Sequence, residues 1–134
     1  PKIQPRAKIQ RDKASTASVV VEQLYRDRLL AGAGWEKREK ENMFTVQLMA
    51  LASKDAEINL KKMLAQVDYR QEAGNFYIFK QATAPTHIYV FYGEYPSIER
   101  ARLVKNSLPQ FLRDHKPYAL SIKDAMAKVV DADK

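Results

Sequence analysis

Two stretches of this chain share one pattern: FTVQLMALASKDAEINLKKML at residues 44–64 and IYVFYGEYPSIERARLVKNSL at residues 88–108. Each starts with an apolar run typical of a β-strand, passes through a turn containing Ser53 or Ser97, and continues with the apolar spacing of a helix. We expect both serines to cap these helices. A strand–helix unit that occurs twice predicts a split β-α-β fold, in which one sheet face packs on helices and the other can stay free.

The remaining segments complete the predicted sheet. Residues 75–81 (NFYIFKQ) are aromatic and apolar, which predicts a strand that forms a hairpin with residues 87–92. Residues 118–121 predict a short last strand, and residues 122–130 predict a final helical turn or two. Residues 67–74 either extend the preceding helix or form a loop. The sequence therefore predicts an α+β fold with a four-stranded antiparallel sheet in βαββαβ order and both repeat helices on one face.

The N-terminal part of the chain differs in composition. Residues 1–17 contain two prolines, no aromatic residue and no periodic pattern, which predicts a disordered basic linker. Residues 18–41 predict an extra N-terminal helix, because their apolar residues, Trp35 among them, recur on one side. Fraying or a bend is expected at the pair Gly32 and Gly34, since glycine weakens a helix. The folded domain proper is then expected at residues 42–134.

Composition restricts the possible functions. The 134 residues carry a net charge of +7, but residues 1–17 supply +4 of it with five basic residues and one acidic residue. Cysteine is absent, and His87 and His115 are far apart, which excludes thiolate chemistry and the usual metal-ligand spacings. No apolar run approaches the ~18 residues of a membrane span. The chain opens at Pro1 without Met, so we expect a fragment of a longer protein.

One face of the predicted sheet is unusually aromatic. Alternation along residues 87–92 directs His87, Tyr89 and Phe91 away from the helices. Because an exposed sheet face normally carries polar residues, two aromatic rings there need an explanation. Either the rings lie beneath the N-terminal helix, against Trp35, or they form a platform for a flat ligand such as a sugar or a base. The same face is expected to carry Gln47 and Met49 from the first strand and Tyr118 at the edge.

Several motifs together suggest a family. The chain contains FTVQL at residues 44–48, IYVFYGEYPSIERA at residues 88–101, Ser-Leu-Pro at residues 107–109 and Lys-Pro-Tyr at residues 116–118. In this order they resemble the SPOR (sporulation-related) domain, closest to its DamX-like variant, over roughly residues 42–130. The two half-motifs of that family are a Val-Gln-hydrophobic strand and a strand ending in Gly-x-aromatic before a Ser and an Ala-bearing helix.

The resemblance implies a non-catalytic domain of a bacterial envelope or cell-division protein. The resemblance therefore leads us to expect a periplasmic domain that is anchored through a missing N-terminal part and binds septal peptidoglycan strands stripped of stem peptides. Partners would be these glycan strands and other envelope or division proteins. By position, Gln47 matches the sheet-face Gln of the family, and His87 and Tyr118 stand where DamX-like domains have Trp. The predicted glycan site is made of Gln47, Met49, His87, Tyr89, Phe91 and Tyr118.

The chain offers little for catalysis. Carboxylates such as Asp55 and Glu99 sit at helix starts, where capping and the helix dipole explain them, and Ser53 and Ser97 have no base placed to activate them. We therefore expect no enzyme, no metal and no cofactor.

Two alternatives to glycan binding remain. An RNA-recognition module shares this ferredoxin- or RNP-like strand order, but its basic-glycine-aromatic consensus is missing, so nucleic acid is not the expected partner. A protein-interaction module would use the N-terminal helix or the apolar sheet face.

Overall fold

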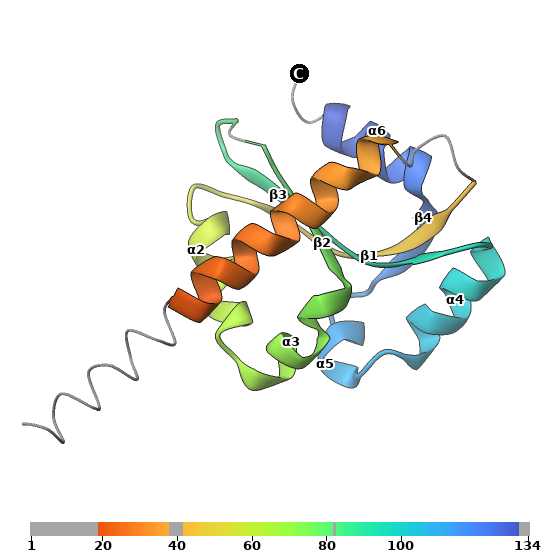
Figure 1. The fold of residues 1–134 in the computed structure, drawn as a ribbon, viewed down its shortest axis with the longest axis horizontal. Helices are drawn as coiled ribbons and strands as arrows, with labels where there is room; N and C mark the ends of the chain where they lie inside the picture. The colour runs from red at the N-terminus through yellow and green to blue at the C-terminus, as the bar shows by residue number, and fades with distance from the viewer. Residues whose placement is uncertain (1–18, 38–41, 82, 132–134) are drawn as a thin grey trace, which may run out of the picture.

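The computed structural model describes residues 19–37, 42–81 and 83–131 (Figure 1). The predicted linker at residues 1–17 lies outside the described residues. The elements are, in chain order, a helix at residues 19–33 (called here the N-terminal helix), η1 (Gly34–Lys37), β1 (Phe44–Ala52), α2 (Ala56–Leu64), α3 (Val67–Glu72), η2 (Ala73–Asn75), β2 (Phe76–Gln81), β3 (His87–Tyr95), α4 (Ile98–Ser107), α5 (Gln110–Arg113), β4 (Tyr118–Ser121) and α6 (Ile122–Asp131).

The four strands form one antiparallel sheet in the order β2-β3-β1-β4. This is the order that a βαββαβ chain adopts when both crossovers are right-handed. The α+β fold predicted from the repeat is therefore confirmed, and it is ferredoxin-like with an extra N-terminal helix.

The repeat helices α2 and α4 build the main core on one face of the sheet. Leu60 and Leu64 of α2 and Ala101 of α4 are fully buried together with Val46 of β1 and Val90 of β3. Each buried leucine contributes roughly 1.5–3 kcal/mol to stability. The spacing of four residues between the two leucines places both on the side of α2 that faces the sheet.

The two predicted serine caps behave differently. Ser97 caps α4 as expected, because its Oγ accepts a hydrogen bond from the backbone N–H of Arg100 at 3.1 Å. Ser53 does not cap α2, which begins at Ala56. Its Oγ instead accepts from the backbone N–H of Asp55 at 3.1 Å, within the turn before the helix. The prediction is wrong there because two turn residues separate the serine from the first helical residue.

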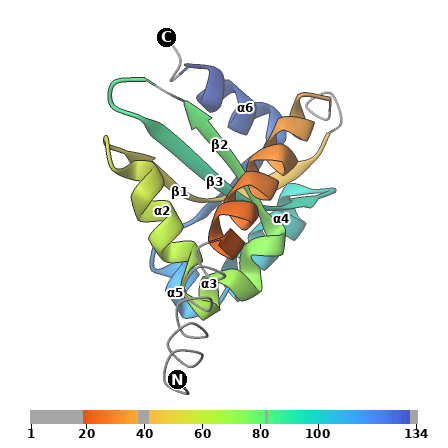
Figure 2. The same cartoon turned by 60° about the vertical axis from the view of Figure 1, so that its left-hand side comes forward.

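The N-terminal helix runs along the β2 edge of the sheet (Figure 2). Arg28 Nη1 donates to the carbonyl oxygens of Gly74 at 2.9 Å and Phe76 at 3.2 Å. At Gly32 the helix approaches β2 so closely that a Cβ atom would lie 2.5 Å from the carbonyl oxygen of Ile78. The helix thereby shields an edge strand that could otherwise pair with another chain. At its end, η1 lies on the sheet face opposite α2 and α4.

Two segments are more regular than their sequence pattern indicates. Residues 67–75 form α3 and η2, which resolves the choice between a helix and a loop in favour of a new short helix. The last segment is not one or two turns but the 10-residue helix α6. Ser121 Oγ accepts from the backbone N–H of Asp124 at 3.0 Å at the start of α6. This helix turns back over the sheet face opposite α2 and α4, where it buries Ile122 and Ala125 (Figure 1).

Candidate functional site

The outer face, defined as the sheet face opposite α2 and α4, carries one row of side chains across all four strands. The strand registers align Tyr77 of β2, Phe91 of β3, Gln47 of β1 and Tyr118 of β4. Three of these residues belong to the predicted site, so the fold does bring them into one row. Tyr77 was not predicted, although the aromatic run of its strand was visible in the sequence.

Trp35 covers the β2–β3 half of this row. Its ring stacks on Tyr77 with 4.6 Å between centroids and lies 5.5 Å from Phe79 and 5.4 Å from Phe91. The indole Nε1–H donates to the carboxylate of Glu94 at 2.7 Å. Trp35 is 1% exposed and Phe91 is 0% exposed. The interpretation that places Phe91 against Trp35 is therefore right, and this ring is part of a second core instead of an accessible platform.

Met49 lies on the other face of the sheet. Between Gln47 and Met49, two steps along β1 oppose a single step along β3, so the strand contains a bulge. Beyond the bulge the side chains are inverted. Met49 pairs with Val90 and is buried in the core beneath α2 and α4, while Ala50 takes its place on the outer face beside Tyr89. The prediction that Met49 contributes to the site is wrong for this reason.

Gln47 and Tyr118 form a small polar cluster at the β4 edge. Tyr118 Oη donates to Gln47 Oε1 at 3.1 Å, and Lys128 Nζ of α6 donates to the same oxygen at 3.3 Å. The Lys128 ammonium also lies 4.4 Å from the centroid of the Tyr118 ring, as in a cation–π contact. Gln47 is only 9% exposed, whereas Tyr118 is 40% exposed. Of the two, Tyr118 is the one that an external ligand can reach.

Besides Tyr118, the outer face is accessible along a strip of β3 and β1, which we call the open strip: Ala50, Ala52, His87 and Tyr89. His87 and Tyr89 are partly exposed, and their rings lie 6.5 Å apart at an interplanar angle of 15°. The register aligns them with Ala52 and Ala50, whose small side chains are exposed. The open strip therefore has two near-parallel rings on β3 beside two exposed alanine methyl groups on β1. His87 Nδ1 contacts Thr83 Oγ1 at 3.0 Å, which leaves Nε2 for a ligand.

Gln81 is a polar group beside the open strip that sequence reasoning missed. It pairs with His87 in the β2–β3 hairpin and is 8% exposed. Its Oε1 atom is buried without a hydrogen-bond partner. A buried acceptor left unpaired costs about 1–3 kcal/mol, so such groups call for an explanation. The only sequence signal was its position, two residues after Phe79 on the outer-face side of a predicted strand.

A cluster of charged groups around Glu57, away from the outer face, makes structural contacts. Glu57 of α2 accepts from Lys80 Nζ at 2.7 Å and from Tyr25 Oη at 2.9 Å, and the hydrogen bond from Lys80 is the main reason why the pKa of Glu57 lies below its ordinary value. Within residues 19–37, 42–81 and 83–131, no three His, Cys, Asp or Glu side chains form a group that could hold a metal ion. No helix in the same residues has the length and apolarity of a membrane span.

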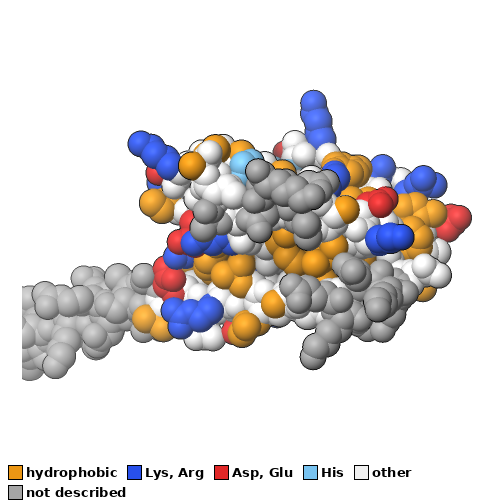
Figure 3. Space-filling view, turned by 90° about the horizontal axis from the view of Figure 1, so that it is seen from above, with side chains coloured by type: hydrophobic (Ala, Val, Ile, Leu, Met, Phe, Trp, Pro, Cys, Tyr) orange, Lys and Arg blue, Asp and Glu red, His pale blue; other side chains and the backbone are white. Residues whose placement is uncertain are grey.

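The surface around α6 and the β2–β3 hairpin is mixed in character. Seen from above, hydrophobic side chains gather toward the middle of the molecule, and Lys and Arg side chains lie mostly at the rim (Figure 3). Comparisons of this chain with known protein families, curated proteins and solved structures gave no match. The resemblance to SPOR domains therefore rests on the sequence motifs alone.

Proposed function

We propose that this domain is a non-catalytic glycan-binding module of a bacterial cell-envelope protein. It binds septal peptidoglycan strands that lack stem peptides, and it does so at the open strip. The observation that carries the proposal is the pair of near-parallel, partly exposed rings of His87 and Tyr89 beside the exposed Ala50 and Ala52. The sequence motifs of the SPOR family provide the second line of support and point to glycan strands as the ligand.

The chemistry of the open strip suits a sugar chain. Aromatic rings stack on the apolar faces of sugar rings, and the methyl groups of Ala50 and Ala52 leave space for a ring above the sheet. Tyr89 Oη and His87 Nε2 can hydrogen-bond sugar hydroxyl and acetamido groups, because both can donate or accept. The exposed ring of Tyr118 extends this apolar contact toward the β4 edge.

Burial of Phe91 weakens the RNA-binding alternative. An RNA-recognition sheet stacks two or three bases on aromatic residues of its central strands. Here the ring of Phe91 is occupied by Trp35. A glycan-binding module needs a smaller accessible stacking surface, and the half of β3 that carries His87 and Tyr89 provides it.

The proposal is tested by co-sedimentation with isolated sacculi, with and without prior removal of their stem peptides. We expect the unmodified domain to sediment with both and to prefer the denuded material. Tyr89→Ala should weaken binding about tenfold, because one stacking contact contributes roughly 1–2 kcal/mol, and His87→Ala should act in the same direction. Val67→Ala is the matched control, because Val67 is an exposed apolar residue of α3, outside the outer face.

Two outcomes would refute this assignment. One is unchanged sedimentation of folded Tyr89→Ala and His87→Ala proteins. The other is salt-dependent binding to single-stranded RNA without any binding to sacculi, which would favour the RNA-recognition alternative.

A further inference from the structure

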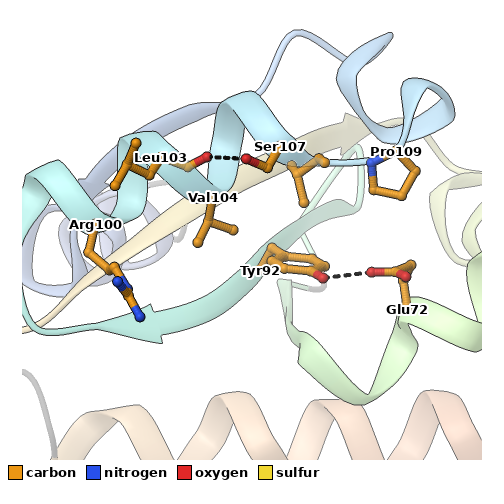
Figure 4. Close-up of a pocket in the computed structure, with 8 residues that line it drawn as sticks. Glu72, Tyr92, Arg100, Leu103, Val104, Ser107 and Pro109 are labelled. Carbon is orange, nitrogen blue, oxygen red and sulfur yellow. Dashed lines mark hydrogen bonds between the residues drawn. The ribbon is translucent and has the colours of Figure 1, made fainter.

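A separate pocket of about 430 Å³ lies on the helix side of the sheet, away from the open strip (Figure 4). Its size falls in the range of small-molecule sites. α4 and the segment that follows it form one wall, the end of α3 forms another, and Tyr92 of β3 lies between them. The lining residues are Glu72, Tyr92, Arg100, Leu103, Val104, Ser107, Leu108 and Pro109.

The pocket has opposite charges at its two ends. Arg100 comes from the first turn of α4, and its side chain extends toward β3 on one side of Tyr92 (Figure 4). Glu72 lies on the other side of Tyr92, at the end of α3. Among the described residues, Arg100 has no ion-pair partner. A cation and a carboxylate separated across one small cavity match a ligand that carries both charges.

Tyr92 holds the Glu72 carboxylate in place. Its Oη donates to Glu72 Oε1 at 2.6 Å and accepts from Asn75 Nδ2 at 3.2 Å. Burial, followed by the contact with Glu72, raises the pKa of Tyr92 above its ordinary value, so the phenol keeps its proton and remains a donor. One carboxylate oxygen is thus fixed by the protein, and the other is available to a ligand.

The wall formed by α4 is apolar and partly unfilled. Leu103 is 61% exposed although it lines the pocket, and Val104, Leu108 and Pro109 continue this surface. Ser107 Oγ donates to the backbone carbonyl of Leu103 at 2.9 Å, so its remaining capacity is as an acceptor. A ligand with a short aliphatic side chain and an amide N–H would complement this wall.

We propose that this pocket binds the zwitterion of a small amino acid or dipeptide. The Glu72 carboxylate receives the ligand ammonium, and the Arg100 guanidinium receives the ligand carboxylate, a pairing that its fork of donors favours. The aliphatic side chain lies against Leu103 and Val104. Nothing in this assignment depends on glycan binding at the open strip.

Isothermal titration calorimetry with three matched ligands tests the proposal: the dipeptide Ala-Ala, its C-terminal amide and its N-acetyl form. We expect Ala-Ala to bind, and each blocked form to bind about tenfold more weakly or worse, because each loses one charge-assisted contact. Absence of Ala-Ala binding at millimolar concentration, or equal binding of all three ligands, would overturn it.

Two substitutions assign each charge to its residue. Arg100→Gln should weaken Ala-Ala to the affinity of the amide while leaving the amide unchanged. Glu72→Gln should weaken Ala-Ala binding to the affinity of the N-acetyl form and leave binding of the N-acetyl form unchanged. A glutamine at this position can still accept a hydrogen bond from Tyr92. Arg102→Gln is the matched control, because Arg102 is exposed on the same helix and does not line the pocket. Equal weakening of all three ligands by either variant would indicate a structural effect and overturn the assignment, and Tyr89→Ala should not change dipeptide binding.

Discussion

At the scale of single residues, Trp35 has the largest influence on the outer face. It is the only tryptophan of the chain, it contacts three aromatic rings of β2 and β3, and its indole N–H is bonded to Glu94. These contacts turn half of an exposed sheet face into a closed aromatic core. Trp35 therefore determines which aromatic residues are accessible, and Tyr89 stays accessible because Trp35 lies over its neighbour Phe91.

Substitution of Trp35 should strongly destabilise the fold. We expect Trp35→Ala to lower the free energy of unfolding by about 3–5 kcal/mol, the usual cost of removing a buried tryptophan. Trp35→Phe should cost less, about 1–2 kcal/mol, because it keeps a ring but loses the bond to Glu94. Urea denaturation followed by circular dichroism measures both. A loss below about 1 kcal/mol for Trp35→Ala would contradict the closed aromatic core.

Tyr95, which is partly buried, should make the protein less stable at high pH. Burial, and to a smaller extent the charge of Tyr77, raises the pKa of Tyr95 from 10.0 to about 12. The folded state thus holds this proton more tightly than the unfolded state. Its contribution is complete below pH 10 and is lost as the pH rises toward 12. The urea concentration at the midpoint of unfolding, measured from pH 9 to 12, should decrease as the pH rises from 10 to 12. The decrease should be less steep for Tyr95→Phe. Equal slopes for the two proteins would refute the assignment to Tyr95.

Residue types and spacing predicted some of these side-chain positions but not others. The cap at Ser97 and the direction of Tyr89 followed from local patterns, because both depend on neighbouring residues only. The position of Met49 could not be predicted, since a bulge changes the strand register without leaving a sign in an alternating apolar sequence. The burial of Phe91 required contact with a residue 56 positions away in the chain, and the sequence left that choice open.

At the scale of elements, the N-terminal helix is fixed to the β2 edge by a close backbone contact. Gly32 makes this contact possible, because any side chain there would meet the Ile78 carbonyl oxygen and the Phe79 ring. The sequence indicated that the helix weakens near its glycines, which is a propensity argument. The structural reason for Gly32 is different, and it depends on where the helix packs.

The two glycines near the end of this helix should respond in opposite ways to the same change. Alanine has a helix propensity about 1 kcal/mol better than glycine. Gly32→Ala should nevertheless destabilise the protein by roughly 1–3 kcal/mol, because its Cβ would lie 2.5 Å from a backbone oxygen. Gly34→Ala is the matched control and should be neutral or slightly stabilising, since nothing lies within 4 Å of its Cβ position. Stabilisation by both substitutions would contradict the packing of the helix on β2.

At the scale of the whole molecule, the duplicated strand–helix unit and the chain ends have separate roles. The repeat supplies the two central strands, β1 and β3, and the helices α2 and α4 that cover the main core, and this topology was predictable because both units carry the same pattern. The outer face is shaped by elements outside the repeat, namely η1 from one end and α6 from the other. Their positions depend on tertiary packing, which explains why the fold was predictable in more detail than the site.

The most direct test of the proposed function is an NMR titration of the isotope-labelled domain with denuded glycan strands. We predict saturable amide shifts concentrated at Ala50, Ala52, His87 and Tyr89, with the amides of α2 unchanged. Absence of shifts at saturating glycan, or shifts confined to α2 and the N-terminal helix, would contradict glycan binding at the open strip.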